Sequence, residues 1–350
     1  MAPTEGTDYP GSYAQLRAWF PGDEDCRDYL DWLRWGQAWT CPACGHDACW
    51  RRADGLRECA RCGRQTSVTA GTIFHKTRTP LTVWFAAAWQ LTSQKHGASA
   101  LGLQRVLGLG SYQTAWAMLH RFRTVMVRPG RERLTGRVEV DETFIGGVRP
   151  GKRGRGAAGK ALVAVAVEQH EPRGFGRARL QVIDNAQAPT LRAFLLDHVE
   201  SGATVATDGL RSYPGAVGTD YDHDPFAVAG SGVPAHIPLP GVHRVASLAK
   251  RWLLGTHQGA VEADHLQAYL DEFVFRFNRR RSRARGLLFY RLLEQAVTAD
   301  PVTYRSLVAN PQPQPGTGTG RRGPRRVPAS LALPPAGRPW RNERQPDLNG

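Results

Sequence analysis

The sequence has no run of 18 apolar residues, and its first ten residues, MAPTEGTDYP, contain no apolar stretch. The first absence excludes a transmembrane helix, and the second argues against a secretory signal peptide. The sequence also has no internal repeat, and its glycines do not form a nucleotide-binding fingerprint. We therefore expect a cytoplasmic protein without a membrane partner.

Acidic residues are scarce relative to basic ones. The chain of 350 residues has 31 Asp and Glu against 46 Lys and Arg, which gives a net charge of +15. A composition that is 41% hydrophobic and 22% charged is typical of a globular protein, and this length allows two or three domains. The charge suggests a polyanionic partner, because neutralised phosphates release counterions. A merely basic surface in a composition rich in Arg, Ala and Gly is the alternative.

Cysteine is also rare, and four of the six cysteines form two CxxC pairs separated by fourteen residues. These four are Cys41, Cys44, Cys59 and Cys62. The spacing predicts a zinc ribbon, since four thiolates can close a tetrahedral structural Zn²⁺ site, and Gly45 and Gly63 suit the knuckle turns. Unrelated CxxC pairs or a redox dithiol are the alternatives. We expect Cys26 and Cys49 to be ordinary buried or free thiols. The basic ribbon could contact DNA phosphates or another protein.

Helical patterns follow the ribbon. An apolar stretch at 81–93 predicts a helix, and residues 97–126 predict a helix, a glycine-rich turn and a second helix that Ser111 caps. If this pair is a helix-turn-helix, the second helix enters the major groove of DNA with Tyr112, Gln113 and Thr114. Helical hairpins with a glycine turn also occur without DNA, but the neighbouring ribbon and the basic chain favour DNA binding.

From residue 137 the pattern changes to short β-branched segments that alternate with helices, which predicts an α/β domain. Asp141 and Asp208 each stand at the end of such a strand. Carboxylates at the ends of adjacent strands can share two divalent metals and promote phosphoryl transfer, although strand-end aspartates also cap turns. Glu142 is expected to point to the opposite face of the strand.

Four segments in order, VEVDETFIGG, ATDGLRSY, VHRVASLAKRWLLGTHQG and HLQAYLDEFVFRFNRR, resemble the ISXO-like insertion-sequence transposases. The resemblance covers roughly residues 12–298, including the zinc ribbon and the segment after it. It implies a DDE-type catalytic domain with an RNase H-like fold, in which Asp141 and Asp208 are the first two ligands of catalytic Mg²⁺ or Mn²⁺. It also implies that the protein cuts and joins the ends of the element.

The third catalytic position departs from the family's pattern. The family places a Glu, sometimes an Asn, on a helix seven residues before a Lys, whereas here His243 precedes Lys250. His243 could ligate a metal, and the site would then accept Mn²⁺ more readily than a site made of carboxylates alone. It could instead position water or shuttle protons, or it could mark a copy that has lost activity. Lys250 and Arg251 would contact DNA phosphate near the scissile bond, although both could be plain surface charges.

A basic, glycine-rich loop at 146–160 contains Lys152, Arg153 and Arg155 and no acid. Such a loop could follow a phosphate backbone, although basic glycine-rich loops are often simply flexible and solvated. We take these three side chains as candidate DNA contacts.

We therefore expect a multidomain α+β protein with a helical segment (1–36), a zinc ribbon (37–70), a helix-turn-helix region (78–130), an RNase H-like mixed-sheet catalytic domain (135–300) and a disordered tail rich in Pro, Gly and Arg (309–350). The combined reading is a transposase that binds terminal inverted repeats, with structural Zn²⁺ and catalytic Mg²⁺ or Mn²⁺. Its partners would be double-stranded DNA, both the ends of the element and the target, and other copies of itself bound to that DNA. When bound to DNA, the protein would be associated with the nucleoid. A decayed or recruited DNA-binding protein and a structure-specific nuclease are the alternatives.

Overall fold

The computed structural model describes residues 2–36, 38–146, 160–170, 174–226, 238–259 and 261–309. The chain divides into two compact units. Unit 1 comprises the residues up to Val125 together with Ser282–Leu307, and unit 2 comprises Met126–Arg281. Almost all of the predicted disordered tail, 309–350, lies outside the described residues.

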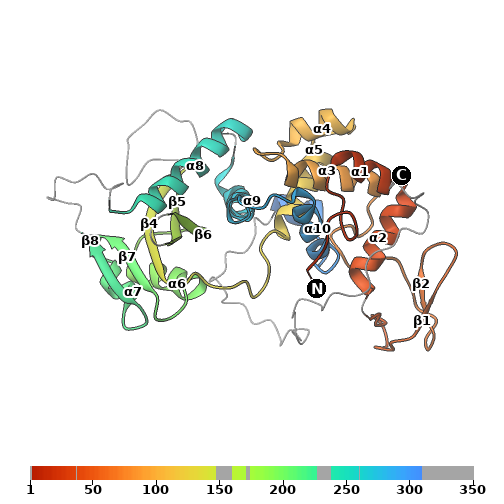
Figure 1. The fold of residues 1–350 in the computed structure, drawn as a ribbon, viewed down its shortest axis with the longest axis horizontal. Coiled ribbons are helices and arrows are strands. Elements are labelled where there is room, and N and C mark those ends of the chain that lie inside the picture. Colours follow the sequence, from red (N-terminus) through yellow and green to blue (C-terminus); the bar gives the residue numbers. More distant parts are fainter. Residues whose placement is uncertain are drawn as a thin grey trace. The chain divides into compact units, whose positions relative to one another are not determined.

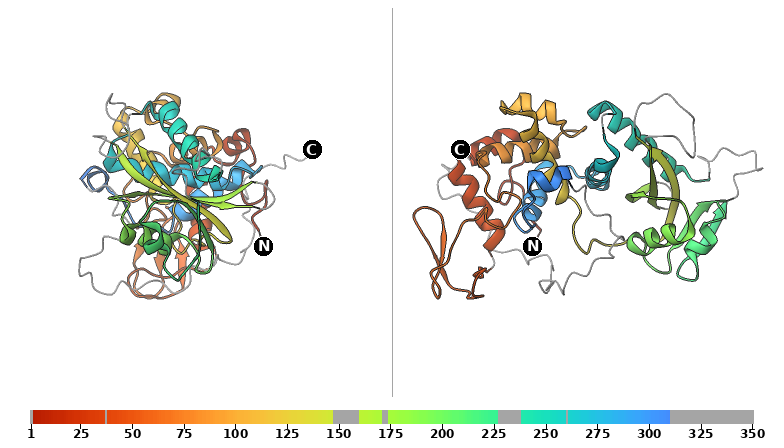
Figure 2. Two further views of the ribbon diagram at one scale, coloured as in Figure 1. Left: turned by 90° about the vertical axis from the view of Figure 1, so that its left-hand side faces the viewer. Right: turned by 180° about the vertical axis from the view of Figure 1, so that it is seen from behind.

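Unit 1 combines helices with a small antiparallel sheet (Figure 1). Its elements are α1 (Tyr13–Trp19), α2 (Asp23–Trp35), β1 (Cys49–Arg51), β2 (Arg57–Cys59), β3 (Gln65–Thr66), α3 (Leu81–Ser93), α4 (Ala100–Leu107), α5 (Tyr112–Thr124), α10 (Arg285–Ala296) and α11 (Tyr304–Ala309). The strands β1, β2 and β3 are adjacent in that order and extend away from the helices of this unit (Figure 2). The predicted helix at 81–93 is confirmed in full as α3.

The predicted hairpin of helices is formed by α4 and α5. Gly108 ends α4 in the left-handed region at φ 62°, where glycine has no steric penalty. Ser111 caps α5 as expected, because its hydroxyl accepts a hydrogen bond from the Thr114 N–H at 3.1 Å. The first turn of α5 is therefore fixed by its own sequence.

Aromatic side chains fill the core of unit 1 and explain why α10 belongs to it. Phe289 of α10 is fully buried, and its ring lies 5.6 Å from Phe85 of α3, 5.7 Å from Trp89 and 6.5 Å from Tyr29 of α2. The expected catalytic domain extended to residue 300, whereas Ser282–Leu307 groups with unit 1. The contacts of Phe289 with three other rings outweigh the position of α10 in the sequence.

Unit 2 contains a five-stranded mixed sheet with the order β6-β5-β4-β7-β8. The strands are β4 (Arg137–Ile145), β5 (Ala161–Gln169), β6 (Phe175–Ile183), β7 (Thr204–Asp208) and β8 (Asp222–Phe226). Strand β5 pairs antiparallel with both β4 and β6, whereas β4 pairs parallel with β7, and β7 pairs parallel with β8. The helices are α6 (Ala188–His198), α7 (Tyr213–Val217), α8 (Pro240–His257), the short 3-10 helix η1 (Ala263–His265) and α9 (Leu266–Asn278). The predicted α+β class with a mixed sheet is thus confirmed.

Helices cover both faces of this sheet (Figure 1). In β5, Val163, Val165 and Val167 belong to the core with α8 and α9, whereas Ala164 and Ala166 belong to the core with α6 and α7. This alternation follows from the two-residue period of a strand. The face of any residue in β4 or β7 can therefore be assigned from its neighbours.

Helix α8, with 18 residues, lies on one face of the sheet and has an exposed side as well as a buried one. Val242, Val245 and Ala249 are buried, while Arg244 and Arg251 are exposed. Neither α8 nor any other helix in the described ranges has the length and apolar character needed to cross a membrane.

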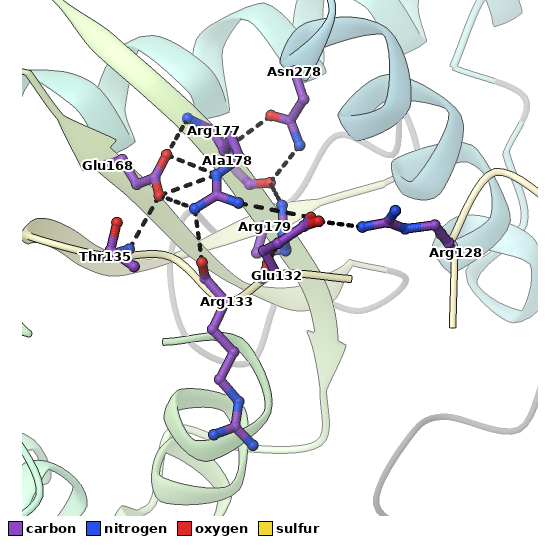
Figure 3. Close-up of polar contacts among 9 residues, drawn as sticks. All are labelled: Arg128, Glu132, Arg133, Thr135, Glu168, Arg177, Ala178, Arg179 and Asn278. Carbon is purple, nitrogen blue, oxygen red and sulfur yellow. Dashed lines mark hydrogen bonds and ion pairs between the residues drawn. The ribbon is translucent and has the colours of Figure 1, made fainter. Parts of the chain in front are cut away.

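A polar cluster joins the start of unit 2 to β5, β6 and α9 (Figure 3). Glu168 of β5 accepts a hydrogen bond from the Thr135 N–H at 3.1 Å and forms an ion pair with Arg177 of β6 at 2.6 Å. Asn278 at the end of α9 accepts from the Ala178 N–H at 2.7 Å and donates to its carbonyl at 3.2 Å. These bonds attach the last turn of α9 to the sheet.

Asp271 of α9 makes the stability of unit 2 depend on pH. Burial raises the pKa of this carboxyl to about 6 from 3.8, although Gln267 donates a hydrogen bond to it at 2.9 Å. Because the pKa is higher in the folded state than in the unfolded state, the free energy of unfolding is largest below pH 4. It falls as the pH rises through 6. We expect Asp271→Asn to gain about 3 kcal/mol in unfolding free energy between pH 4 and pH 8 relative to the unmodified chain.

Urea unfolding at the two pH values, followed by circular dichroism, measures this difference. Asp264→Asn is the matched control, because Asp264 is exposed on η1 and should show no such change. An equal pH dependence in the unmodified chain and the Asp271→Asn variant would contradict the assignment.

Candidate functional site

The four ribbon cysteines converge on one point. The Sγ atoms of Cys41 and Cys62 lie 3.6 Å apart, those of Cys44 and Cys59 also lie 3.6 Å apart, and all four lie within 4.8 Å of one another. Four thiolates bound to one Zn²⁺ at about 2.3 Å in a tetrahedron are separated by roughly 3.8 Å. The cluster is therefore consistent with the predicted structural zinc.

The two knuckles have the same backbone design. Gly45 and Gly63, one after each second cysteine, have φ angles of 73° and 66°. The Gly45 N–H donates to the Cys41 carbonyl at 2.9 Å, and the Gly63 N–H donates to the Cys59 carbonyl at 3.0 Å. Any other residue would be strained at these positive angles. The expected need for glycine in the knuckles is thus confirmed.

The candidate catalytic residues come from β4, β7 and α8. In the parallel ladder Val140 pairs with Thr207, so Asp141 and Asp208 follow on adjacent strands. Val140 belongs to the core with α6 and α7, and Asp141 therefore faces α8. Ala206 belongs to the core with α8, so Asp208, two residues later, faces the same way.

The carboxylate of each aspartate accepts a hydrogen bond from a backbone N–H that lies one or two residues later in the chain. Asp141 Oδ1 accepts a hydrogen bond from the Glu142 N–H at 2.8 Å, and Asp208 Oδ1 accepts from the Leu210 N–H at 3.0 Å. Burial raises the pKa of the Asp141 carboxyl, and the negative charge of Asp208 raises it further. This mutual repulsion is what a bound cation would relieve.

His243 lies in the first turn of α8, opposite Asp141. Its Nε2 atom is 4.0 Å from Asp141 Oδ2. This nitrogen is buried and has no hydrogen-bond partner among the described residues. A buried imidazole nitrogen without a hydrogen-bond partner costs folding free energy unless it binds a ligand.

Lys250 lies about two turns further along α8 and points to the same face of the sheet. Its Nζ donates to Thr143 Oγ1 of β4 at 2.6 Å, two residues after Asp141. Burial lowers the pKa of this ammonium group, and the positive charge of Lys160 lowers it further. Arg251, the next residue, is exposed. The structure thus brings Lys250, His243 and Asp141 to one side of β4.

Glu139 is a residue of this region that the sequence analysis did not single out. Its side chain is fully buried, and its Oε2 accepts a hydrogen bond from the Val242 N–H of α8 at 2.9 Å. Gln169 of β5 donates to Oε1. Because β4 also carries Asp141, this carboxylate fixes the first turn of α8, and with it His243, to the strand. An acid within an apolar strand, two residues before Asp141, was the available signal.

Glu142 has a separate environment. Tyr213 of α7 donates a hydrogen bond to Glu142 Oε1 at 2.6 Å. This contact confirms that Glu142 faces away from α8, as its position next to Asp141 indicated. The acid next to Asp141 is therefore a matched reference for experiments on Asp141.

The other candidate residues have more varied positions. Tyr112, Gln113 and Thr114 are exposed in the first turn of α5. The candidate DNA contacts Lys152, Arg153 and Arg155 lie outside the described residues. In the part of the chain that the structure describes, only the four cysteines bring three or more metal-ligating side chains within 4.8 Å of one another. Asp141, Asp208 and His243 face one another more loosely.

Comparison with known families gives two matches. Residues 133–278 match the ISXO2-like transposase domain, and residues 21–65 match the transposase zinc-ribbon domain. The first match contains Asp141, Asp208, His243 and Lys250, and the second contains the four ribbon cysteines. No curated protein matches the chain. Together the two matches cover more than half of the sequence.

Proposed function

The chain belongs to the ISXO2-like transposases, and we propose that it cleaves DNA at the ends of an insertion sequence and joins those ends to a target. The observation that carries the proposal is the common direction of three side chains: Asp141, Asp208 and His243 all face the same side of the mixed sheet. The mixed sheet with helices on both faces supports an RNase H-like catalytic domain.

The three side chains suit divalent cations. Mg²⁺ prefers carboxylate oxygens, and an imidazole nitrogen shifts the preference towards Mn²⁺. Two ligands of one such ion, each at about 2.1 Å, lie at most about 4.2 Å apart. The 4.0 Å between His243 Nε2 and Asp141 Oδ2 fits this limit. When bound, divalent ions would activate water or a 3′-hydroxyl and stabilise the leaving oxygen.

The chain's own residues orient the reacting groups. Asp141 and Asp208 are fixed by backbone hydrogen bonds, so little ordering of these side chains is needed when they bind cations. Glu139 holds the turn of α8 that carries His243. Lys250, on the same side of β4, would neutralise a DNA phosphate next to the scissile bond, where a charge-assisted hydrogen bond is strongest.

Unit 1 would recognise the terminal inverted repeats. Tyr112, Gln113 and Thr114 are exposed at the start of α5, which is where a recognition helix reads base edges in the major groove. The basic zinc ribbon would add phosphate contacts. DNA contacts by the basic loop at 146–160 and the assembly of several copies on DNA are proposals of the same kind.

A cleavage and joining assay tests the proposed function. The purified chain is incubated with a duplex that ends in the element's inverted repeat, a target plasmid, and Mg²⁺ or Mn²⁺. We expect nicks at the repeat and joined products in the plasmid. Nicks without joined products would support a structure-specific nuclease instead, and binding without nicks in either ion would support a DNA-binding protein that does not act as an enzyme.

His243→Glu is expected to change the choice of metal ion. The imidazole should make cleavage by the unmodified chain more efficient in Mn²⁺ than in Mg²⁺, and a carboxylate at this position should lower that ratio by about tenfold. The measurement is the cleavage rate in each ion at equal protein concentration. The control is Arg244→Glu, which adds a carboxylate at the next, exposed position of α8.

An unchanged ratio of Mn²⁺ to Mg²⁺ rates in His243→Glu would show that His243 does not ligate the metal. Inactivity of the unmodified chain in both ions, together with activity of His243→Glu, would identify a decayed copy. That outcome would favour the alternative of a DNA-binding protein that has lost its catalysis.

A further inference from the structure

A pocket of about 390 Å³ lies in unit 1 between the segment 73–79, which follows the zinc ribbon, and helix α5. We call it the basic pocket, because four of its lining residues are basic and none is acidic. These four are His75, Lys76, Arg78 and Arg121. His75, Lys76 and Arg78 are exposed, so their charged or polar ends are accessible to a ligand. The lining selects for a negatively charged partner.

The segment that carries these side chains is held rigidly by one hydroxyl. Thr77 Oγ1 accepts hydrogen bonds from Trp84 Nε1 at 2.9 Å and from the Thr79 N–H at 3.2 Å, and it donates to the Thr79 carbonyl. Phe74 is fully buried against the rings of Trp84 and Phe122. Because Lys76 and Arg78 flank Thr77, the backbone below both side chains is fixed before any ligand binds.

Two further features prepare the segment for an anion. Lys76 has a φ of 53°, a left-handed conformation that is uncommon outside glycine. His75 Nδ1 accepts a hydrogen bond from the Gly71 N–H at 3.2 Å, so in the neutral ring Nε2 carries the proton and can donate. The segment therefore holds a residue with a sterically disfavoured backbone and an oriented hydrogen-bond donor at the rim of the same pocket. Strained backbone conformations of this kind often occur at functional sites.

The opposite wall of the pocket is the first part of α5. Gln113 and Thr114 line it, and both are exposed. The N-terminus of a helix attracts anions through its free N–H groups and its dipole. The basic pocket and the candidate base-reading residues thus share one surface of unit 1.

We propose that the basic pocket binds the phosphate backbone of duplex DNA immediately beside the base pairs that α5 reads. The inference rests on the proposed function, since it assigns a role in DNA binding to the segment 73–79, which lies between the four-cysteine cluster and the hairpin of α4 and α5. Lys76 and Arg78 supply point charges, His75 supplies a hydrogen-bond donor, and Arg121 lies deeper in the wall, where its Nε donates to the Val302 carbonyl at 2.8 Å. Contacts of this kind fix the register of the helix on the duplex without reading sequence.

A double substitution, Lys76→Gly with Arg78→Ala, tests the proposal. Glycine is chosen at position 76 because it adopts a positive φ without penalty, so the charge is removed and the backbone keeps its conformation. The probe is a fluorescent 30-base-pair duplex of mixed sequence, and anisotropy gives the dissociation constant at several salt concentrations. Loss of two phosphate contacts should make the slope of log K against log salt less steep by about 1.8, and should weaken binding at 0.1 M salt on the order of 10- to 100-fold.

Arg17→Ala is the matched control, because Arg17 is exposed on α1 and does not line the basic pocket. Gln113→Ala is the second control: it should reduce the preference for the inverted repeat over the mixed-sequence duplex, whereas the double variant should weaken both equally. Circular dichroism and zinc content verify that each variant is folded.

The outcomes separate this inference from the proposed function. Tight binding by both the unmodified chain and the double variant, with equal salt slopes, would overturn the role of the basic pocket and leave the transposase proposal intact. No binding of any duplex by the unmodified chain would overturn the proposed function itself. A loss of affinity in the Arg17→Ala control equal to that in the double variant would show that the effect is general charge and would also overturn the inference.

Discussion

Asp141→Asn is expected to lower the rate of DNA cleavage by at least about a thousandfold. The amide keeps the shape of the side chain but removes the charge that faces His243 and Asp208. Metal stabilisation of transition-state charge amounts to several kcal/mol, and about 4 kcal/mol corresponds to a factor of a thousand. The measurement is the single-turnover cleavage rate of a duplex that ends in the inverted repeat, with Mg²⁺ and then with Mn²⁺.

Glu142→Gln provides the control for Asp141→Asn, because Glu142 is the adjacent acid on the opposite face of β4. Its hydrogen bond from Tyr213 can be accepted by an amide oxygen, so this variant should cleave at close to the normal rate. Affinity for DNA should be unchanged in both variants. Cleavage by Asp141→Asn at the normal rate, or an equal loss in Glu142→Gln, would show that the reacting groups lie elsewhere.

Cys59→Ala is expected to abolish zinc binding and unfold the ribbon. Cys59 is fully buried, and with Trp39 and Cys41 it forms a core cluster far too small to fold without the metal. A structural Zn²⁺ in a peptide of this kind contributes on the order of 10–16 kcal/mol, much of which is lost with one thiolate. Zinc content per chain should fall from one to near zero, and limited proteolysis should cut within residues 38–66.

Cys49→Ser is the control for the zinc experiment. Cys49 is in β1 but outside the cluster of four, and its sulfur accepts a hydrogen bond from Arg57 that a hydroxyl can also accept. This variant should retain one zinc per chain and resist the protease. Retention of zinc by Cys59→Ala would mean that the two CxxC pairs do not form one site.

The features of this fold that the sequence predicted are those that depend on nearby residues or on a regular spacing. The spacing of Cys41, Cys44, Cys59 and Cys62 predicted the cluster, and Ser111 predicted the start of α5. The two-residue period of a strand predicted that Asp141 and Glu142 lie on opposite faces of β4. Each of these signals depends on neighbours within a few residues or on a repeated spacing.

Features that depend on distant contacts were not predicted. The place of α10 in unit 1 depends on Phe289 meeting Phe85 and Tyr29, which lie about two hundred residues or more earlier in the chain. The hydrogen bond between Glu139 and the Val242 N–H joins residues 103 positions apart. Nothing near either residue in the sequence indicates its partner, so tertiary structure was required to assign their roles.

The return of the chain to unit 1 at Ser282 makes unit 2 an insertion into the N-terminal unit rather than an appendage to it. A gene interrupted anywhere between codons 126 and 281 would therefore lose Phe289 and the rest of α10 along with some or all of unit 2. Its product would lack part of its aromatic core, and we expect quality-control proteases to remove it. Under the proposed function, premature stops would then leave no truncated protein to compete for the ends of the element. A substitution at Asp141 or Asp208, by contrast, would yield an inert protein that still binds those ends.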